Sequence, residues 1–406
     1  MSDAASTLAA IQALLASLPA GTNPYLAIDA FVLSSLDKHL PISFFRQMYF
    51  LAGLFAFDLF TVCTILALQL ISRQFRLFPI KDGSLRSTSA HTLALLLYGL
   101  FYVFAIVAIF RSVDYYRGGI IRDLIGWRVF MWWAPLVAGV LITHALACNY
   151  LTHLTSTSQL PPARSTTHFR RLTLHLAAVL LAFFASNAPL AALSVKRYHA
   201  SLDALGAIDG TLRQAAAAYT GTFDIASLAA AAPLLEAVQS KQEELVDILG
   251  IAYPMLGAWA AFTMLCVALV ATLHVRSLNR CIAAVATGEK DSEDDTRVAE
   301  WKRTKRRLTL AAAAFEVACS GFLALAIYVG CKTEDTMNQL VSIQAVDLAL
   351  YYLYSLAGAS VAVLLLFATI QSVRAHGRKS NAAEAEERAS TEGDEGEKKA
   401  DEAGEV

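Results

Sequence analysis

The stretch Leu93–Phe110, LALLLYGLFYVFAIVAIF, decides the fold because it carries no charged residue over a length that can cross a lipid bilayer. A spanning helix needs about 20 mostly apolar residues, at about 1.5 Å rise per residue, to cover a hydrocarbon core of about 30 Å. Leu249–Val275 likewise holds no acid, lysine or arginine. Buried helices of soluble proteins rarely run so long without a charge, so we predict an integral membrane protein.

The composition of the whole chain agrees with this prediction. Of 406 residues, 56% are hydrophobic and 17% are charged, whereas soluble domains carry about 25% charged residues. Seven stretches are long and apolar enough to span, so the sequence predicts an all-α, seven-helix transmembrane bundle over residues 48–372. The predicted spans are 48–72, 91–111, 129–151, 172–195, 249–275, 308–330 and 347–372.

Prolines refine three of these spans. Pro254 is expected in the first turn of the fifth span, where its missing N–H costs little. Pro135 and Pro189 are expected deeper, where they should kink the third and fourth spans.

The basic residues predict an orientation. Short loops rich in lysine and arginine stay on the cytoplasmic side. About two thirds of the chain's 33 basic residues fall after the first, third and fifth spans or in the tail. The sequence therefore predicts an outer N-terminus and a cytoplasmic C-terminus. The weakest point is the second loop, which is predicted to be outside and yet holds Arg111, Arg117, Arg122 and Arg128.

Three segments lie outside the predicted spans. Residues 1–47 form an outer segment in which apolar residues recur at helical spacing between Leu8 and Leu18, which indicates a short amphipathic helix. Residues 196–247 form an alanine-rich outer loop, expected to hold short helices with Gly206 and Gly210 among the breaks. Residues 373–406 form the cytoplasmic tail, which is acidic and expected to be disordered.

Asp58, His144 and Glu316 are ionisable residues that lie well inside predicted spans, away from the span ends. Such residues usually face a partner or a water-filled cavity, because charge at this depth is costly. One interpretation is a buried polar network that switches or relays protons. The alternative is fixed hydrogen bonding between helices, worth about 0.6 to 2 kcal/mol per contact.

A polar and aromatic stripe on the seventh span suggests a ligand pocket. Asp347, Tyr351 and Tyr354 share one helical face. Together with Asn187 and Trp259 they are candidate ligand-binding residues. The alternative is anchoring at the membrane interface combined with helix packing.

A basic run precedes the sixth span within the inner loop 276–307. Next to a membrane such a run attracts anionic lipid or a cytosolic partner, at about 1 kcal/mol per residue. The alternative is that it only fixes the topology. The run consists of Lys302, Arg303, Lys305, Arg306 and Arg307.

The predicted topology of residues 48–372 resembles that of the seven-helix receptors that signal through G proteins. The motifs of those receptors are missing: Cys148–Leu151 reads CNYL in place of an Asp-Arg-Tyr type triplet, and the seventh span has no Asn-Pro-x-x-Tyr. The resemblance implies a protein of the plasma membrane that senses an external ligand and signals through the inner loop 276–307 and the tail to a cytosolic protein.

Other functions stay open. The chain could be a transporter or proton-coupled carrier that uses Asp58 and Glu316, or a non-catalytic membrane organising protein. We expect no enzymatic activity, because no metal-ligand or nucleophile constellation occurs at the required spacing. We also expect no cofactor, metal or nucleic-acid partner, while the lipid bilayer is an expected partner. The sequence leaves the oligomeric state open.

Overall fold

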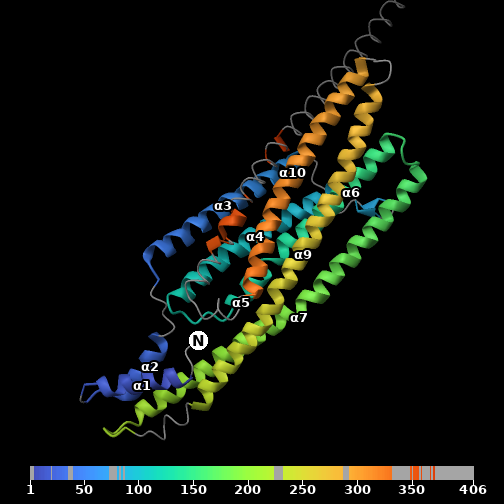
Figure 1. Ribbon diagram of the computed structural model, residues 1–406. Helices are drawn as coiled ribbons and strands as arrows, with labels where there is room; N and C mark the ends of the chain where they lie inside the picture. Colours follow the sequence, from blue (N-terminus) through green and yellow to red (C-terminus); the bar gives the residue numbers. More distant parts are fainter. Residues whose placement is uncertain are drawn as a thin grey trace, which may run out of the picture.

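The computed structural model shows an all-α protein in which long helices lie side by side in an elongated bundle (Figure 1). Two very short strands, β1 (Ile80–Lys81) and β2 (Ser84–Leu85), pair antiparallel in a connection between two helices. The structure describes residues 4–19, 21–34, 40–72, 80–81, 84–85, 87–223, 232–286 and 292–331, and single residues or short runs between 348 and 370.

The described part of the chain contains nine labelled helices. They are α1 (Ala4–Ser17), α2 (Pro24–Ser34), α3 (Ile42–Ile71), α4 (Ser87–Tyr116), α5 (Leu124–Phe130), α6 (Trp133–Ser156), α7 (Pro162–Ala217), α9 (Ala232–Ala286) and α10 (Ser292–Cys331).

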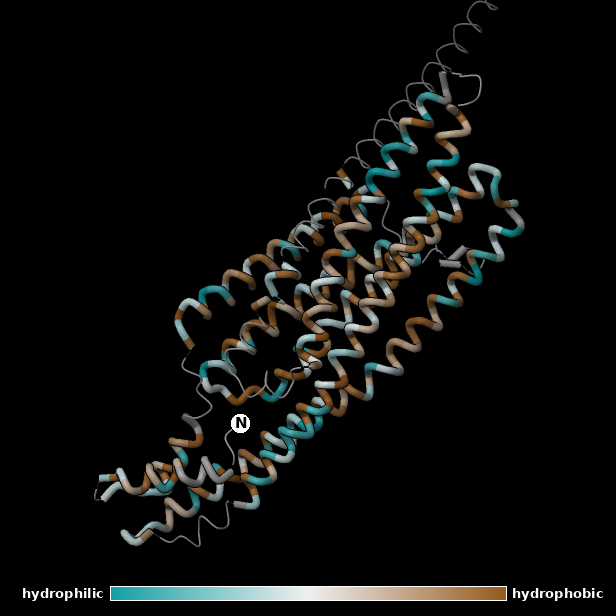
Figure 2. The backbone as a smooth tube through the Cα atoms, in the orientation of Figure 1, coloured by the Kyte–Doolittle hydropathy of each residue, from teal (hydrophilic) through white to brown (hydrophobic). Residues whose placement is uncertain are grey.

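Six segments of the described chain are long and apolar enough to cross a membrane. They are α3, α4, α5 together with α6, α7, α9 and α10. Apolar residues dominate the middle of the bundle, and polar ones gather toward its two ends (Figure 2). The predicted seventh span, 347–372, lies mostly outside the described residues. Its described residues, among them 351–355, are helical, but a count of seven spans stays a prediction.

The surface of these helices is apolar where a lipid bilayer would surround them. Phe60, Leu181 and Leu265 are 70%, 72% and 71% exposed, whereas Met48 and Phe55 are fully buried. In water such a surface would be costly, but in a bilayer it faces hydrocarbon. The helices therefore bury one apolar face and present another to lipid.

The α6 helix occupies the centre of the bundle. In its most apolar stretch 72% of the residues are buried, against 11% for α10. Gly139 allows this position: a Cβ atom there would lie 3.1 Å from the Thr263 side chain of α9 and 3.2 Å from the Phe315 ring of α10. The helix packs against α4, α7 and α9.

The third predicted span is divided into two helices. The α5 helix ends at Phe130 and α6 begins at Trp133, two residues before Pro135. A proline has no N–H to donate, and its ring clashes with the carbonyl four residues earlier, which belongs to Met131 here. At the place where a kink was expected from Pro135, the helix is instead broken at Met131–Trp132.

The helices α7 and α9 continue far beyond their predicted spans, over 56 and 55 residues. The prediction that Gly206 and Gly210 interrupt the segment is wrong, because α7 runs through both. Ile208 and Leu212 are buried one turn apart in this part of α7 and pack against other helices. This packing, with the high helix propensity of the surrounding alanines, offsets the roughly 1 kcal/mol that each glycine costs.

The ends of α7 and α9 join α1 and α2 in a separate small core (Figure 1). We call this unit the head; it comprises α1, α2, residues 201–217 of α7 and residues 232–245 of α9. Tyr25 and Ile28 of α2 are 3% and 1% exposed at its centre. The Asn23 side chain caps α2 by accepting the Tyr25 N–H at 3.0 Å, and it donates to the Ala216 carbonyl of α7 at 3.0 Å.

Pro254 lies in the interior of α9, which corrects its predicted place in a first turn. On α10, Gly330 faces it so closely that a Cβ atom there would overlap the Pro254 ring. The absence of a side chain at Gly330 thus sets the distance between α9 and α10, as small residues do in membrane helix pairs.

Gly330→Ala is therefore expected to lower the free energy of unfolding by about 1–3 kcal/mol, because α10 has to move away from the Pro254 ring. Gly206→Ala is the matched control: a Cβ atom there would meet nothing within 4 Å, so a gain of about 0.5–1 kcal/mol is expected. Thermal unfolding in detergent micelles measures both changes. A Gly330→Ala protein as stable as the parent would contradict the close packing.

Candidate functional site

The most conspicuous polar group inside the bundle is the carboxylate of Asp58. It lies in the middle of α3 and is 0% exposed. Neither of its oxygens has a hydrogen-bond partner among the described residues. Groups of this kind are rare in native proteins, because an unsatisfied buried polar atom is costly. The position of Asp58 therefore needs an explanation other than stability.

Two groups from other segments converge on Asp58. A Cβ atom at Gly358 would lie 2.7 Å from the Tyr102 hydroxyl oxygen and 3.1 Å from Asp58 Oδ2. Gly358 thus lets the backbone of the last apolar segment approach both side chains. Tyr102, on α4, is also an electrostatic neighbour of Asp58. The carboxylate, the phenol and the glycine backbone come from three different parts of the chain.

The polar groups continue from Asp58 toward α10. The Tyr98 ring stacks on the Tyr102 ring at 6.5 Å between centroids, and Cys319 lies within electrostatic range of Tyr98 and Tyr354. Glu316, one turn before Cys319, interacts with it. One Glu316 oxygen is buried and has no hydrogen-bond partner in the described structure. Asp58 and Glu316 therefore lie at two ends of one series of polar side chains.

Aromatic rings surround this series. The Tyr354 ring lies 4.8 Å from Trp132, 5.7 Å from Phe101 and 5.8 Å from Phe322, measured between ring centroids. Such edge and tilted contacts stabilise a core beyond the area that they bury. Tyr354 thus serves as part of a packed aromatic core between α4, α6 and α10.

The five predicted ligand-binding residues fall into separate places. Tyr351 and Tyr354 belong to the aromatic core, and Tyr351 lies 6.2 Å from the Phe55 ring of α3. Asn187 and Trp259 lie where α7 meets α9, and Trp259 Nε1 donates to Ser186 Oγ at 3.0 Å. Asp347 lies outside the described residues. A single pocket formed by all five stays a prediction.

His144 lies apart from Asp58. It is buried on α6, with its Nε2 3.5 Å from Cys148 Sγ. It lines a cavity of about 270 Å³ between α6, α7 and α9, together with His175 and Cys266. The structure thus divides the predicted network into the Asp58–Glu316 series and His144, which lines a separate and mostly apolar cavity.

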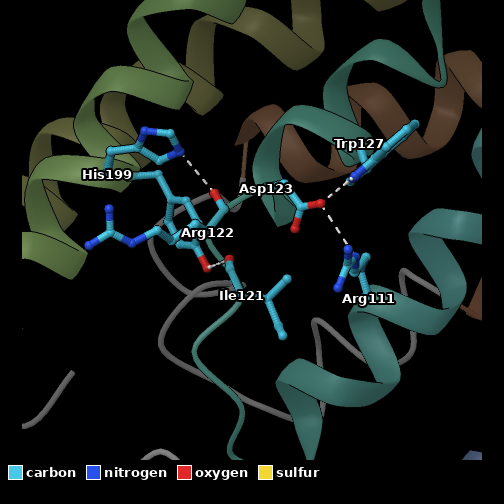
Figure 3. A network of polar contacts seen from close by, with 7 residues as sticks. Arg111, Ile121, Arg122, Asp123, Trp127 and His199 are labelled. Atoms are coloured by element: carbon cyan, nitrogen blue, oxygen red, sulfur yellow. Dashed lines mark hydrogen bonds and ion pairs between the residues drawn. The ribbon is translucent and has the colours of Figure 1, made fainter.

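The loop between α4 and α5 forms a polar junction that the sequence did not reveal (Figure 3). Asp123 accepts from Trp127 Nε1 at 2.8 Å and pairs with Arg111 at 3.3 Å. On α7, His199 Nε2 donates to the Arg122 carbonyl at 2.9 Å, and the Tyr198 hydroxyl donates to the Ile121 carbonyl at 2.8 Å. These contacts hold α4, α5 and α7 together beside the head.

The same region explains the four arginines that weaken the predicted orientation. Arg111 pairs with Asp123, and Arg122 pairs with Asp203 at 2.9 Å. Arg128 donates to Ser112 and Tyr116, and Arg117 lies over the Phe45 ring at 5.1 Å. Local partners thus engage all four side chains. A sequence count does not include these contacts, in which Arg111 and Arg122 are paired with carboxylates.

The head carries a buried carboxylate of its own. Asp29 of α2 is 7% exposed and lies 3.8 Å from Arg213, which pairs with Asp209 at 2.8 Å. Burial raises the pKa of Asp29 above its usual range, and the neighbouring Asp209 raises it further, while Arg213 acts in the opposite direction. Asp29 thus links the stability of the head to pH.

The sign of this link follows from the raised pKa. The folded head holds the Asp29 proton more tightly than the unfolded chain does, so this contribution to stability is full below the ordinary aspartate pKa of about 3.9 and is lost as pH rises through the raised value. Asp29→Asn is expected to flatten the fall in the unfolding midpoint as the pH rises above about 4. Asn23→Ala, which weakens the anchoring of α2 without changing charge, should keep the parental slope; an equally steep fall in Asp29→Asn would contradict the assignment.

The predicted basic run lies in the helical hairpin at the far end of the bundle from the head. We call residues 276–286 of α9 and 292–307 of α10 the stalk; in Figure 1 the two helix ends extend together beyond the other spans. Lys302, Arg303, Arg306 and Arg307 are exposed there, and Lys305 is half-buried. Residues 302–307 of the stalk therefore present a basic surface.

No protein family, no curated protein and no solved structure matches this chain. The class of protein is therefore inferred from the length and the apolar surface of the helices. Six segments of spanning length among the described residues, with large apolar side chains exposed on them, indicate a multi-pass, all-α membrane protein surrounded by the lipid bilayer.

Proposed function

We propose that this protein is a receptor-like, non-catalytic transducer that senses an external ligand at its head side and signals through the stalk and the tail. The observation that carries the proposal is the continuity of α9. One unbroken helix connects Val238 in the core of the head with Ala286 at the end of the stalk. At about 1.5 Å rise per residue it is about 80 Å long.

A continuous helix favours transduction because it moves as a unit. Known switches use helix shifts of about 1–2 Å, which packed interfaces convert into discrete states. On α9 the head end pairs with α7 through Glu244, which lies 2.7 Å from Arg197, and the bundle part packs on α10. A shift of the head against α7 therefore reaches α10 and the basic residues of its stalk.

The orientation in this proposal places the head outside and the stalk in the cytoplasm, at the plasma membrane. The basic surface of the stalk supports it, since such segments resist translocation. Two of the arginines near the head, Arg111 and Arg122, weigh less against it, because carboxylates pair with them.

Hydrogen–deuterium exchange on the full chain in lipid nanodiscs tests the coupling. Tyr25→Ala loosens the head core, and we expect faster exchange both in α2 and in residues 276–307. The exposed Leu26→Ala, on the same helix, is the matched control and should change neither region. A Tyr25→Ala protein with a loosened head and an unchanged stalk would contradict transduction and favour an organising role.

Asp58 supports a second candidate, a proton-coupled carrier. A buried carboxylate with unsatisfied oxygens, in one series of polar side chains with Glu316, is the kind of group that transporters use. If this function holds, Asp58→Asn and Glu316→Gln each abolish pH-dependent flux in proteoliposomes. A receptor shows no flux, but it loses recruitment of its cytosolic partner when the five basic residues at 302–307 are replaced by glutamine.

A further inference from the structure

An apolar groove of about 680 Å³ lies between α4, α5, α6 and α7, at the head end of the spans. A second hollow of about 630 Å³ adjoins it and shares Phe130, Val195 and His199 with it. Neither hollow contains the residues of the Asp58 series. The groove is therefore separate from the Asp58 series. An inference about its ligand does not rest on the proposed function.

The groove is open to the lipid-facing surface. Three large side chains on its rim, Leu100, Phe130 and Phe184, are 42%, 41% and 42% exposed. Along α7 it extends from Phe184 to His199, about 22 Å at the helical rise. This exceeds half of a hydrocarbon core of about 30 Å, so one leaflet's acyl chain has room along its length.

The end of the groove near the head is polar and carries an unmet positive charge. Asp123 and His199, both on its rim, belong to the junction in Figure 3. Asp123 is paired with Arg111, and Asp203 is paired with Arg122. Lys196 is exposed at the same mouth, and no ion pair to it occurs within the described part of the chain. The charged side chains at the mouth therefore sum to one net positive charge, which is that of Lys196.

We propose that this groove binds a phospholipid with an anionic headgroup, with one acyl chain along α7 and the phosphate at Lys196. The apolar walls and the lateral opening suit a chain that enters from the bilayer. Trp127 and Trp133 line the groove, and indole rings favour the depth at which headgroups meet hydrocarbon. A lysine at the depth of the headgroups attracts an anionic phosphate by about 1 kcal/mol.

Gly126 provides a way to close the groove without disturbing the helices. It lines the groove on α5, and a Cβ atom there would have Val195 Cγ2 as its nearest neighbour at 3.9 Å, an ordinary contact distance. Gly126→Ala is thus tolerated and leaves the groove open. Gly126→Leu directs a larger side chain into it. Lys196→Gln removes the charge at the mouth. Because Lys196 is exposed, this variant is expected to fold, and it tests the proposal even if Gly126→Leu does not fold.

The test uses the full chain in phosphatidylcholine vesicles that contain a phosphatidylglycerol with a photoreactive group in its acyl chain. Mass spectrometry of the cross-linked peptides is expected to find adducts in 123–137 and 184–200, displaced by unlabelled phosphatidylglycerol more readily than by phosphatidylcholine. Gly126→Leu abolishes these adducts and Gly126→Ala retains them. Lys196→Gln lowers the preference for phosphatidylglycerol about fivefold, whereas Arg171→Gln, at the opposite end of α7, leaves it unchanged.

Three results would overturn the proposal. Adducts spread evenly over α3 and α10 would show ordinary lipid contact around the bundle. Equal displacement by phosphatidylcholine would remove the role of headgroup charge. Displacement by inorganic phosphate alone would identify a soluble anion, and not a lipid, as the ligand.

Discussion

Trp132→Ala is expected to lower the free energy of unfolding by about 3–5 kcal/mol, a loss typical of a large aromatic side chain removed from a core. Trp132 is the largest of the fully buried side chains in the described structure, at 1% exposure. Its ring contacts Phe101 at 5.9 Å, Phe322 at 5.4 Å and Tyr354 at 4.8 Å between centroids. Truncation leaves a cavity at the point where α4, α6, α10 and the last apolar segment meet, and close-packed aromatic neighbours cannot fill it.

Phe60→Ala is the control for this prediction. Phe60 is 70% exposed on α3 and faces the surroundings of the bundle. Its truncation removes no packed core, so a change within about 0.5 kcal/mol is expected. Denaturant-induced unfolding in mixed micelles compares the two variants. Equal losses for both would show that aromatic packing around Trp132 does not hold the bundle together.

The spans could be predicted because their signal is local. A run such as Leu93–Phe110 is energetically acceptable only as a helix across the hydrocarbon core of a bilayer, and α4 contains it entirely. The helix ends could not be predicted in the same way. Hydropathy falls after residue 195, but α7 continues to Ala217 because Ile208 and Leu212 find partners in α1, α2 and α9. Those partners are distant in the sequence, and a local pattern does not contain them.

The candidate site could also be predicted only in part from the sequence. The ionisable residues at bilayer depth stand out in a sequence, so Asp58 and Glu316 could be singled out. Their connection through Tyr98 and Tyr102 could not be predicted, since a tyrosine in an apolar helix usually indicates packing. The junction at Asp123 could not be predicted for a related reason. Tyr198 and His199 of α7 donate there to backbone carbonyls of a loop far away in the sequence, and such contacts leave no spacing pattern.

The tyrosines 351 and 354 show how one pattern allows two roles. Their shared helical face predicted either a ligand pocket or packing. The described contacts place the Tyr354 ring against Trp132, Phe101 and Phe322, where close packing leaves little room for a ligand. The lipid-facing groove, in contrast, is formed by side chains that look unremarkable in the sequence, such as Leu100 and Phe184.

Asp58→Leu is expected to raise the free energy of unfolding by about 1–3 kcal/mol. Leucine has nearly the shape of aspartate, with methyl groups in place of the two carboxylate oxygens. Both oxygens are buried and without a hydrogen-bond partner in the described structure, so the substitution removes an unmet desolvation penalty and adds apolar contact. A residue that lowers stability at such a depth is typically one that function requires. We therefore expect the stabilised variant to lose transport or signalling.

Asn187→Leu provides the matched comparison, because Asn187 is also buried within a spanning helix but its amide is bonded. Its Nδ2 donates to the Phe183 carbonyl at 2.8 Å, so the same kind of substitution should lower stability by about 0.5–1.5 kcal/mol. Thermal unfolding of the two variants in the same micelles thus gives shifts of opposite sign. If Asp58→Leu is destabilised as well, Asp58 has a structural bonding role, and the series from Asp58 to Glu316 no longer marks a functional site.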